Sequence, residues 1–436
     1  MKQDVSRRTM LKGGGAALAG LTVLRVAGPA HAFNAPHDEL AQPDDFARGG
    51  RQPPILGEPG AEVVPWLDQP TATPFPGAVD NLLVWEDLES WYTPTDNFFY
   101  VTHYPIPMLS ANTHTLGLAG LVARPRTFTI EDLKALPRHE VDFTLECSGN
   151  TGTGLDFFIG GIGNARWAGA RLAPLLEHAG PLDEASEVIS WGADSGTVTI
   201  RDNSGIVSAG QTGVGTPDAD GGIDLTITEQ FARSMSLRDA LARDNLLCYE
   251  MNGDALPTEH GFPLRLIAPG WYGVANVKWL TRIEIVDRRY AGRFMARDYV
   301  SIREETRATD TLWTFATVGR DRLKSAPAKV TRLNGAYTVW GAAWGAPIEA
   351  VEVRVDDGPW NAAELLGPRT PRRSQGFAWT FWKFPWGAPA AGEHRIASRA
   401  FDAEGHVQPP PDDPFLASRR TYWESNGQIT RVVQVA

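Results

Sequence analysis

The sequence predicts an α+β protein in which a mixed α+β domain, residues 93–290, precedes an all-β, immunoglobulin-like sandwich, residues 326–436. Three observations predict this arrangement. The chain has 436 residues, which is too long for one hydrophobic core. Short apolar runs alternate with helix signals in the first region, whereas the second region contains only strand patterns and turn signals. The composition, 42% hydrophobic and 21% charged, is typical of a soluble globular protein.

The first 32 residues are predicted to be an export signal that is removed from the mature protein. Ser6–Lys12 contains a twin-arginine pair, Ala16–Leu24 is apolar, and Ala30–Ala32 is a small-x-small cleavage site. The apolar run is shorter than the roughly 20 residues that span a bilayer, so no membrane anchor is expected after cleavage. Because the twin-arginine route exports folded proteins, we expect a periplasmic protein that acquires a cofactor before export.

The net charge indicates which partners are unsuitable. The chain carries −11, and its first 32 residues hold five basic side chains against one acidic, so the mature protein is more acidic still. Such a balance argues against nucleic acid and anionic membranes as partners. It permits docking to a basic redox protein.

Composition and apolar runs predict an arm, a strand and a helix in the N-terminal half of the chain. Residues 33–92 are rich in Pro and Gly and are expected to form a wrapping arm. Val141–Leu145 reads as a buried strand that runs into a tight turn at Ser148–Asn150. Leu172–Ala179 is predicted to be a helix closed by Gly180, because glycine favours the left-handed conformation that ends helices.

The later elements are predicted from periodicity and turn residues. Gly192–Gly196 indicates a hairpin turn, and Glu229–Ala242 has a helical pattern. Residues 291–325 are expected to form a charged connector. In the sandwich, Val351–Val355 alternates apolar and polar residues, as in a half-buried strand, and Asp357–Gly358 is a hairpin turn signal.

Two cysteines are candidates for chemistry. Cys147 follows the predicted strand, and a thiolate fixed at a strand end suits a soft metal, although a lone cysteine is more often inert core. Cys248 lies in an apolar run and is predicted to be core. An oxidising compartment would permit a disulfide between them, which the buried setting of Cys248 disfavours. No C-x-x-C-H is present, so no haem is expected, and no dinucleotide motif occurs.

Eight segments, in their order and spacing, resemble the sulfite oxidase family of molybdopterin enzymes. They are F-F-Y-V-T-H-Y-P-I-P (Phe98–Pro107), E-C-S-G-N (Glu146–Asn150), A-R-W-A-G-A-R-L (Ala165–Leu172), G-A-D-S (Gly192–Ser195), Y-E-M-N-G (Tyr249–Gly253), H-G-F-P-L-R (His260–Arg265), P-G-W-Y-G-x-x-x-V-K-W-L (Pro269–Leu280) and R-D-Y (Arg297–Tyr299). The resemblance runs from about Trp91 to the C-terminus. It implies a molybdopterin-binding domain over 93–290, a connector over 291–325 that carries Tyr299, and a dimerisation sandwich over 326–436.

The resemblance also implies a cofactor and roles for single residues. The cofactor would be molybdenum–molybdopterin, with Cys147 as the protein ligand to the metal and Tyr299 as the active-site phenol. Arginine and lysine would neutralise the cofactor phosphate. The residues expected to bind the cofactor are Phe99, Val101, Thr102, His103, Cys147, Asp194, His260, Arg265, Asn276, Val277 and Lys278.

The chain departs from the family where sulfite oxidases place anion-binding arginines. Those three positions are occupied here by Val101, Gly152 and Asn426. A desolvated oxyanion needs cationic partners, so the substrate is less well defined than the cofactor. Candidate replacements for the missing charges are Arg166, Arg171, Arg297 and His103.

Three functions are consistent with these features. The first is a periplasmic oxidase of sulfite or a related sulfur compound, which passes electrons to a separate c-type cytochrome. The second is a molybdenum-dependent reductase of S- or N-oxides, which the missing arginines favour. The third is a non-enzymatic secreted binding module in which Cys147 is inert.

Overall fold

The structure is a computed structural model that describes six parts of the chain, residues 55–68, 78–150, 160–202, 216–217, 223–366 and 376–436. The predicted export signal, residues 33–54 of the predicted arm, and Gly152 lie outside the described residues. Within the described part of the chain, no helix is both long enough and apolar enough to cross a membrane.

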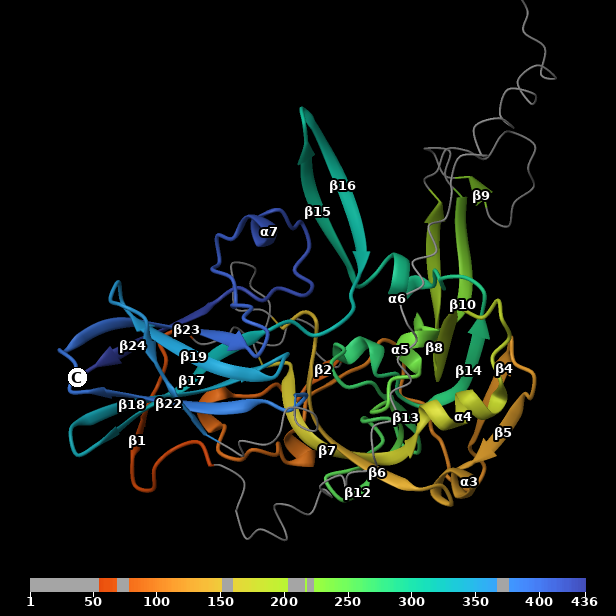
Figure 1. Cartoon of the computed structure of the whole chain (residues 1–436), viewed down its shortest axis with the longest axis horizontal. Helices are drawn as coiled ribbons and strands as arrows, with labels where there is room; N and C mark the ends of the chain where they lie inside the picture. The colour runs from red at the N-terminus through yellow and green to blue at the C-terminus, as the bar shows by residue number, and fades with distance from the viewer. Residues whose placement is uncertain (1–54, 69–77, 151–159, 203–215, 218–222, 367–375) are drawn as a thin grey trace, which may run out of the picture. The chain divides into compact units, whose positions relative to one another are not determined.

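Two sheets form the region predicted as the first domain (Figure 1). The six-stranded sheet has the order β5-β4-β14-β8-β10-β9, and only its β14–β4 pair is parallel. Its strands are β4 (Thr115–Gly120), β5 (Arg126–Thr129), β8 (Glu187–Asp202), β9 (Thr216–Pro217), β10 (Ile223–Ser236) and β14 (Leu280–Val286). The second sheet has the order β12-β11-β7-β6, with β13 beside β11. Its strands are β6 (Arg138–Glu146), β7 (Ile162–Arg171), β11 (Leu246–Met251), β12 (Asp254–Ala255) and β13 (Arg265–Ile267).

The helices among the described residues are short, so the predicted α+β class describes this mainly β protein only loosely. The α-helices are α3 (Ile130–Lys134), α4 (Leu172–Ala179), α5 (Leu237–Ala240), α6 (Arg293–Ala296) and α7 (Pro414–Ala417), and the 3₁₀ turns are η1 (Trp85–Asp87), η2 (Thr95–Asn97) and η3 (Gly273–Ala275). Helix α4 is confirmed with its predicted bounds, and Gly180 ends it at φ +67°. Most backbone hydrogen bonds of regular structure in the described residues join strands within sheets.

Two local predictions in this region are wrong. The predicted helix Glu229–Ala242 is mostly strand β10, which pairs with β8 to Ser236, and only α5 is helical. The predicted hairpin turn at Gly192–Gly196 lies inside strand β8. Both glycines are needed for packing: a Cβ on Gly192 would overlap the Asp194 carboxylate, and one on Gly196 would overlap the Tyr104 ring. Cross-strand pairing therefore overrides the local helix and turn signals.

The C-terminal region is mainly β, as predicted, with only the one-turn helix α7 among its described residues, and its two sheets pack face to face. One sheet has the order β1-β17-β18-β22-β21 and the other β20-β19-β23-β24, and every pair is antiparallel. The strands are β1 (Glu62–Val64), β17 (Lys324–Leu333), β18 (Ala336–Trp344), β19 (Ile348–Val355), β20 (Asn361–Ala362), β21 (Glu364–Leu366), β22 (Thr380–Gly387), β23 (Gly392–Asp402) and β24 (Ile429–Val435). Val351 and Val353 are buried in the core between the sheets, which confirms the predicted alternation.

The described parts of the arm and the connector are attached to these sheets. Strand β1 adds to the sandwich, and β2 (Val79–Asp80) pairs with β3 (Tyr100–Val101). Trp85 stacks on Trp344 of the sandwich with ring centroids 5.8 Å apart. The segment predicted as a connector contains α6 and the hairpin β15–β16 (Val300–Arg307 and Asp310–Thr317), which projects from the fold in Figure 1.

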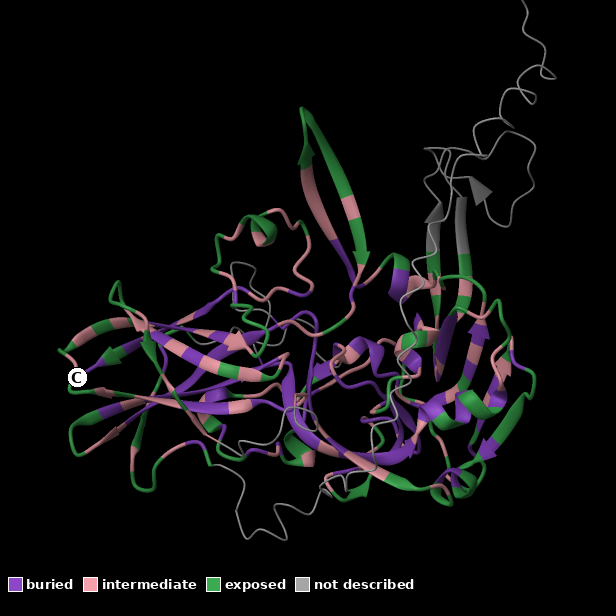
Figure 2. Ribbon diagram, in the orientation of Figure 1, coloured by how far each residue is buried: buried purple, intermediate pink, exposed green. Residues whose placement is uncertain are grey.

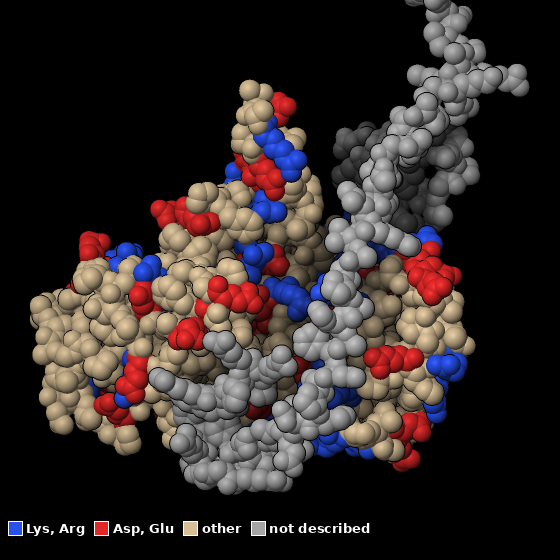
Figure 3. All heavy atoms as spheres, in the orientation of Figure 1, with Lys and Arg blue, Asp and Glu red and all other residues tan. Residues whose placement is uncertain are grey.

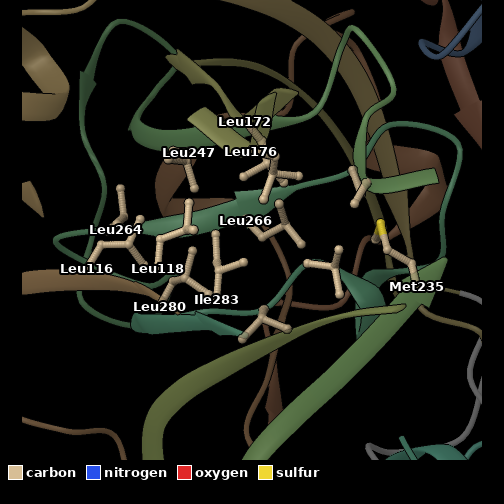
Figure 4. Close-up of a cluster of buried hydrophobic side chains, with 14 of the residues drawn as sticks. Leu116, Leu118, Leu172, Leu176, Met235, Leu247, Leu264, Leu266, Leu280 and Ile283 are labelled. Carbon is tan, nitrogen blue, oxygen red and sulfur yellow. The ribbon is translucent and has the colours of Figure 1, made fainter. Parts of the chain in front are cut away.

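A leucine-rich core holds the elements around the first sheet together. Figure 4 shows Leu172 and Leu176 of α4 near Leu247, Leu266 and other buried apolar side chains. Each fully buried side chain of this kind contributes roughly 1.5–3 kcal/mol. Figure 2 shows that burial extends along β6 and β7, the strands that lead to the site described below. On the face shown in Figure 3, acidic and basic side chains are intermingled.

Candidate active site

Cys147 is held by a tight turn at the end of β6. Its backbone N–H donates to Gly161 O at 2.8 Å, and its carbonyl accepts from Asn150 N at 2.8 Å. Asn150 Oδ1 accepts from Gly161 N at 3.2 Å, so the turn is closed from both sides. Burial raises the pKa of the Cys147 thiol to about 11. The sulfur is therefore protonated unless a cation such as a metal ion stabilises the thiolate.

A buried ion pair supports this turn from the side of the sandwich. Lys324 Nζ lies 2.6 Å from Glu146 Oε1, and both side chains are buried. Lys324 also donates to Asn150 O at 2.9 Å, and Asn150 Nδ2 donates to Glu146 Oε1 at 3.0 Å. Because a single cation binds both ends of the turn, strand β17 fixes the position of Cys147. The sequence analysis did not find this pair, since Lys324 and Glu146 are far apart in the chain.

One pocket collects ten of the twelve predicted site residues. Its empty volume is about 630 Å³, counting the part open to solvent. The predicted residues in its wall are Phe99, Val101, His103, Cys147, Asp194, His260, Arg265, Asn276, Lys278 and Tyr299. Thr102 and Val277 are not part of the wall. Thr102 N donates to Ala78 O, and Val277 is buried in the core.

One end of the pocket, which we call the cationic end, contains Asp194, His260, Arg265 and Lys278. Arg265 donates to His260 O at 2.9 Å and to Asn276 O at 3.0 Å. Lys278 Nζ donates to Glu259 O at 2.7 Å. Three buried polar atoms here have no partner among the described residues: Asp194 Oδ1, His260 Nε2 and Arg265 Nε. Buried polar atoms are normally hydrogen-bonded, so their state indicates a site for a polar ligand.

The pKa values at the cationic end also suit an anionic ligand. Burial, assisted by Arg265, lowers the pKa of Lys278 to about 7. Burial and the charges of Arg265 and Lys278 lower the pKa of His260 to about 3. Burial raises the pKa of Asp194 to about 6. A phosphate placed beside Arg265 and Lys278 would stabilise both cations.

The other end of the pocket, the aromatic end, surrounds Cys147 and Tyr299. The Tyr299 hydroxyl lies 2.6 Å from His103 Nε2, and the Tyr299 ring packs on Trp423 with centroids 4.3 Å apart. Burial and neighbouring cations lower the pKa of His103 to about 3, so the imidazole is neutral. Burial and nearby negative groups raise the pKa of Tyr299 well above its usual value. A neutral phenol and a neutral imidazole thus share a short hydrogen bond.

The candidate replacements for the missing anion-binding arginines do not supply a free cation here. Arg166 donates to Asp142 at 3.2 Å and to the Tyr92 hydroxyl at 2.6 Å. Arg171 precedes α4 outside the pocket, and Arg297 borders a separate hollow. His103 lines the pocket but is neutral.

The positions where the family's anion-binding arginines are missing add no charge to the aromatic end. Val101 lies in the pocket wall, and Asn426 Nδ2 donates to Leu323 O at 3.3 Å. Gly152 lies outside the described residues.

Several residues of the aromatic end were missed by the sequence analysis. Phe231 lines the pocket from β10, a strand where the sequence predicts a helix, and Arg233 lies two residues further along the same strand. Glu424 N donates to Ser148 O at 2.8 Å, which ties the neighbouring Trp423 to the Cys147 turn. Contacts of this kind come from chain segments hundreds of residues apart, so no local signal reveals them.

These features together define a class of protein. A buried cysteine, a phenol–imidazole pair and a cationic end with unpartnered polar atoms fit a molybdenum–molybdopterin group, with sulfur for the metal and charge for the phosphate. Comparison with known families agrees. Residues 103–294 match the oxidoreductase molybdopterin binding domain, and residues 322–424 match the Mo-co oxidoreductase dimerisation domain.

Known relatives identify the family. The chain is 29% identical over 396 residues to sulfite oxidase of Gallus gallus, covering 85% of this chain and 78% of that protein. It is 30% identical over 355 residues to mitochondrial sulfite oxidase of Drosophila melanogaster, covering 74% of this chain but only 56% of that protein. The chain belongs to the sulfite oxidase family of molybdopterin-dependent oxidoreductases.

A solved structure has the same fold along almost the whole chain. The sulfane dehydrogenase SoxCD from Paracoccus pantotrophus superposes with a TM-score of 0.65 at 24% sequence identity. The match covers 95% of this chain and 98% of that one.

Proposed function

We propose that the protein is a periplasmic molybdenum oxidoreductase that oxidises sulfite or a related sulfur compound and passes electrons to a separate c-type cytochrome. The observation that carries the proposal is the position of buried Cys147 in one pocket with the Tyr299–His103 pair and the cationic end. In this reaction sulfite and water give sulfate, two protons and two electrons. The acidic net charge of −11 suits a basic electron acceptor.

The chain's residues divide the binding of the cofactor between them. The molybdenum cofactor would supply a centre that accepts two electrons and transfers oxygen derived from water. Cys147 would be the protein ligand to the metal, and Arg265 and Lys278 would neutralise the phosphate. The unpartnered atoms of Asp194 and His260 would bind polar edges of the pterin. Backbone groups of Phe99, Val101 and Asn276, which line the pocket, would complete the binding set.

Tyr299 and His103 would act on the substrate. The Tyr299 hydroxyl is a donor whose position is fixed by His103, so it can hydrogen-bond to an oxygen of the bound anion. His103 is a weak base because burial lowers its pKa to about 3, so its role would be to orient the phenol by a hydrogen bond. The Trp423 ring covers Tyr299 and limits the access of water.

A reductase of S- or N-oxides is the second candidate. It is favoured by the neutral, aromatic surroundings of Cys147, because a neutral oxide needs no cationic pocket. The non-enzymatic alternative is not supported, since the chain belongs to an oxidoreductase family.

Assembly and export are part of the proposal. The match of residues 322–424 to a dimerisation domain supports a homodimer. Light scattering at micromolar concentration is expected to give twice the mass of the mature chain, and a monomer would contradict the proposed assembly. Fractionation is expected to place the mature protein in the periplasm, and replacement of Arg7 and Arg8 by lysine should retain it in the cytoplasm.

The function is tested by metal content and by assays in both directions. Purified protein is expected to contain about one molybdenum per chain, because the chain has one predicted ligand cysteine, Cys147. Sulfite-dependent reduction of cytochrome c supports the first candidate. Oxidation of a reduced dye by S- or N-oxides, without sulfite oxidation, would support the second. Protein without molybdenum after export by its own signal would overturn both.

A further inference from the structure

Arg233 is a buried arginine on β10 beside the aromatic end of the pocket. Only 2% of its surface is exposed. Its described partners are two backbone carbonyls, Phe294 O and Val318 O, the second at 2.6 Å from Nη2. A buried guanidinium that binds carbonyls instead of a carboxylate carries a desolvation cost without a full counter-charge. The packing of β10 alone does not require a charged side chain at this buried position.

The two carbonyls lie on either side of Tyr299 in the chain. Phe294 belongs to α6, which precedes Tyr299, and Val318 follows strand β16, which ends the projecting hairpin. Val318 N donates to Tyr299 O at 2.9 Å, so the base of the hairpin closes on Tyr299 itself. Figure 1 shows α6 and the base of β15–β16 near β10. One planar guanidinium therefore holds both ends of the segment that carries the phenol.

Tyr299 needs such support because its backbone is strained. Its φ is +57°, a conformation that is uncommon for a residue with a large side chain. The conformation points the phenol at His103, 2.6 Å away, and lets the ring pack on Trp423. A conformation of this kind persists only where its surroundings determine it from several directions.

We infer that Arg233 is a positioning residue for Tyr299: its fork binds Phe294 O and Val318 O and thereby fixes the phenol against His103. Lysine at this position would keep the charge but reach only one carbonyl. The same cation, buried beside Tyr299, also contributes positive potential to an end of the pocket from which the family's arginines are missing. The inference concerns this chain's own geometry, although its kinetic test rests on the proposed function.

The first test needs neither cofactor nor activity. Hydrogen exchange of the cofactor-free protein is compared between wild type and Arg233→Lys, with exposed Arg238→Lys as the matched control. Loss of one support is expected to speed exchange of the Val318 amide about tenfold, the equivalent of one hydrogen bond. The β8–β10 amides should keep their protection. Unchanged exchange at Val318, or a loss of protection throughout β8–β10, would overturn the inference.

The second test is a double-mutant cycle with Tyr299→Phe. Arg233→Lys is expected to lower kcat about ten- to hundredfold in the wild-type background, as a misplaced reacting group does. In the Tyr299→Phe background it should change kcat by less than about twofold, because the group it positions is already gone. Arg233→Gln serves as a second variant if the lysine side chain disturbs folding. Equal losses in both backgrounds would show a general structural role and refute the positioning role.

Discussion

The two ends of the pocket differ in the kind of side chain that surrounds the ligand. The cationic end contains Arg265 and Lys278 and three polar atoms without a described partner. The aromatic end contains Cys147 and Tyr299, with Trp423 packed on Tyr299, and Arg233, whose charge acts on Tyr299, is bound to backbone carbonyls. The cationic end therefore offers charge for a cofactor phosphate, whereas the aromatic end offers no free cation for a doubly charged anion. We expect the phosphate and the substrate to contact different parts of one pocket.

The largest expected effect comes from the proposed metal ligand, Cys147. Cys147→Ser is expected to abolish activity and to lower molybdenum content to below about a tenth of wild type, because a serine hydroxyl is a poor ligand for a soft metal. Molybdenum analysis and steady-state assays check this prediction.

Cys248 offers a matched control for that substitution. It is the other buried cysteine, and its sulfur donates to Glu250 O at 3.1 Å outside the pocket. Cys248→Ser should retain molybdenum and activity with at most a modest loss of stability. A fully active Cys147→Ser enzyme would remove this residue from the metal site.

The aromatic end is tested next by removing one oxygen atom. Tyr299→Phe loses the hydroxyl that lies 2.6 Å from His103, and kcat is expected to fall about ten- to hundredfold. Molybdenum content should not change, because the substitution leaves Cys147 and the cationic end intact. Tyr104→Phe is the control, since the Tyr104 hydroxyl hydrogen-bonds Glu229 outside the pocket. Equal kcat values for Tyr299→Phe and wild type would show that the phenol has no part in the reaction.

The residues of the cationic end can be predicted from the sequence. The packing of the aromatic end can be predicted less well. Asp194, His260, Arg265 and Lys278 occur in short segments with recognisable spacing, and the structure brings all four to one pocket. The aromatic end depends on β10 and on Trp423, which meet Tyr299 only through long-range contacts. The pattern of Glu229–Ala242 predicts a helix, but pairing with β8 makes most of this segment strand β10.

The fold shows the same division between local and long-range signals. Helix α4 has a local stop signal in Gly180, and its bounds were predicted correctly. The glycines at 192 and 196 suggested a turn because their packing against Asp194 and Tyr104 cannot be read from neighbours in the chain. The buried Glu146–Lys324 pair likewise joins two regions that the sequence presents separately.

The missing charge can be restored at one position of the aromatic end. Val101→Arg is expected to lower KM for sulfite about ten- to hundredfold, since one charge-assisted hydrogen bond to a buried anion contributes roughly 1.5–3 kcal/mol. Val101→Gln is similar in length but uncharged and should change KM much less. A wild-type KM already in the low micromolar range would show that another cation binds the anion, and Arg233 would be the first to examine.

The smallest expected effect belongs to the cationic end and concerns stability. In the folded, cofactor-free protein the pKa of Lys278 is about 7, below its ordinary value near 10.5, because burial and Arg265 disfavour the charged form. Between these two pH values the unfolded chain binds more protons than the folded one, so the free energy of unfolding rises with pH. The slope is at most about 1.4 kcal/mol per pH unit, and solvent in the pocket reduces it.

Urea unfolding at pH 7, 8 and 9 isolates this contribution of Lys278. The pKa values of His260 and Asp194, about 3 and about 6 in the folded state against ordinary values of 6.5 and 3.8, lie below this range, so both groups contribute little to the slope there. The stability of wild type relative to Lys278→Met is expected to increase with pH in the cofactor-free protein. In cofactor-loaded protein the increase should shrink, because a phosphate beside Lys278 keeps the amine charged in the folded state. Parallel curves for the two cofactor-free proteins would mean that Lys278 is not desolvated, and the contrast between the two ends of the pocket would then rest on Arg265 alone.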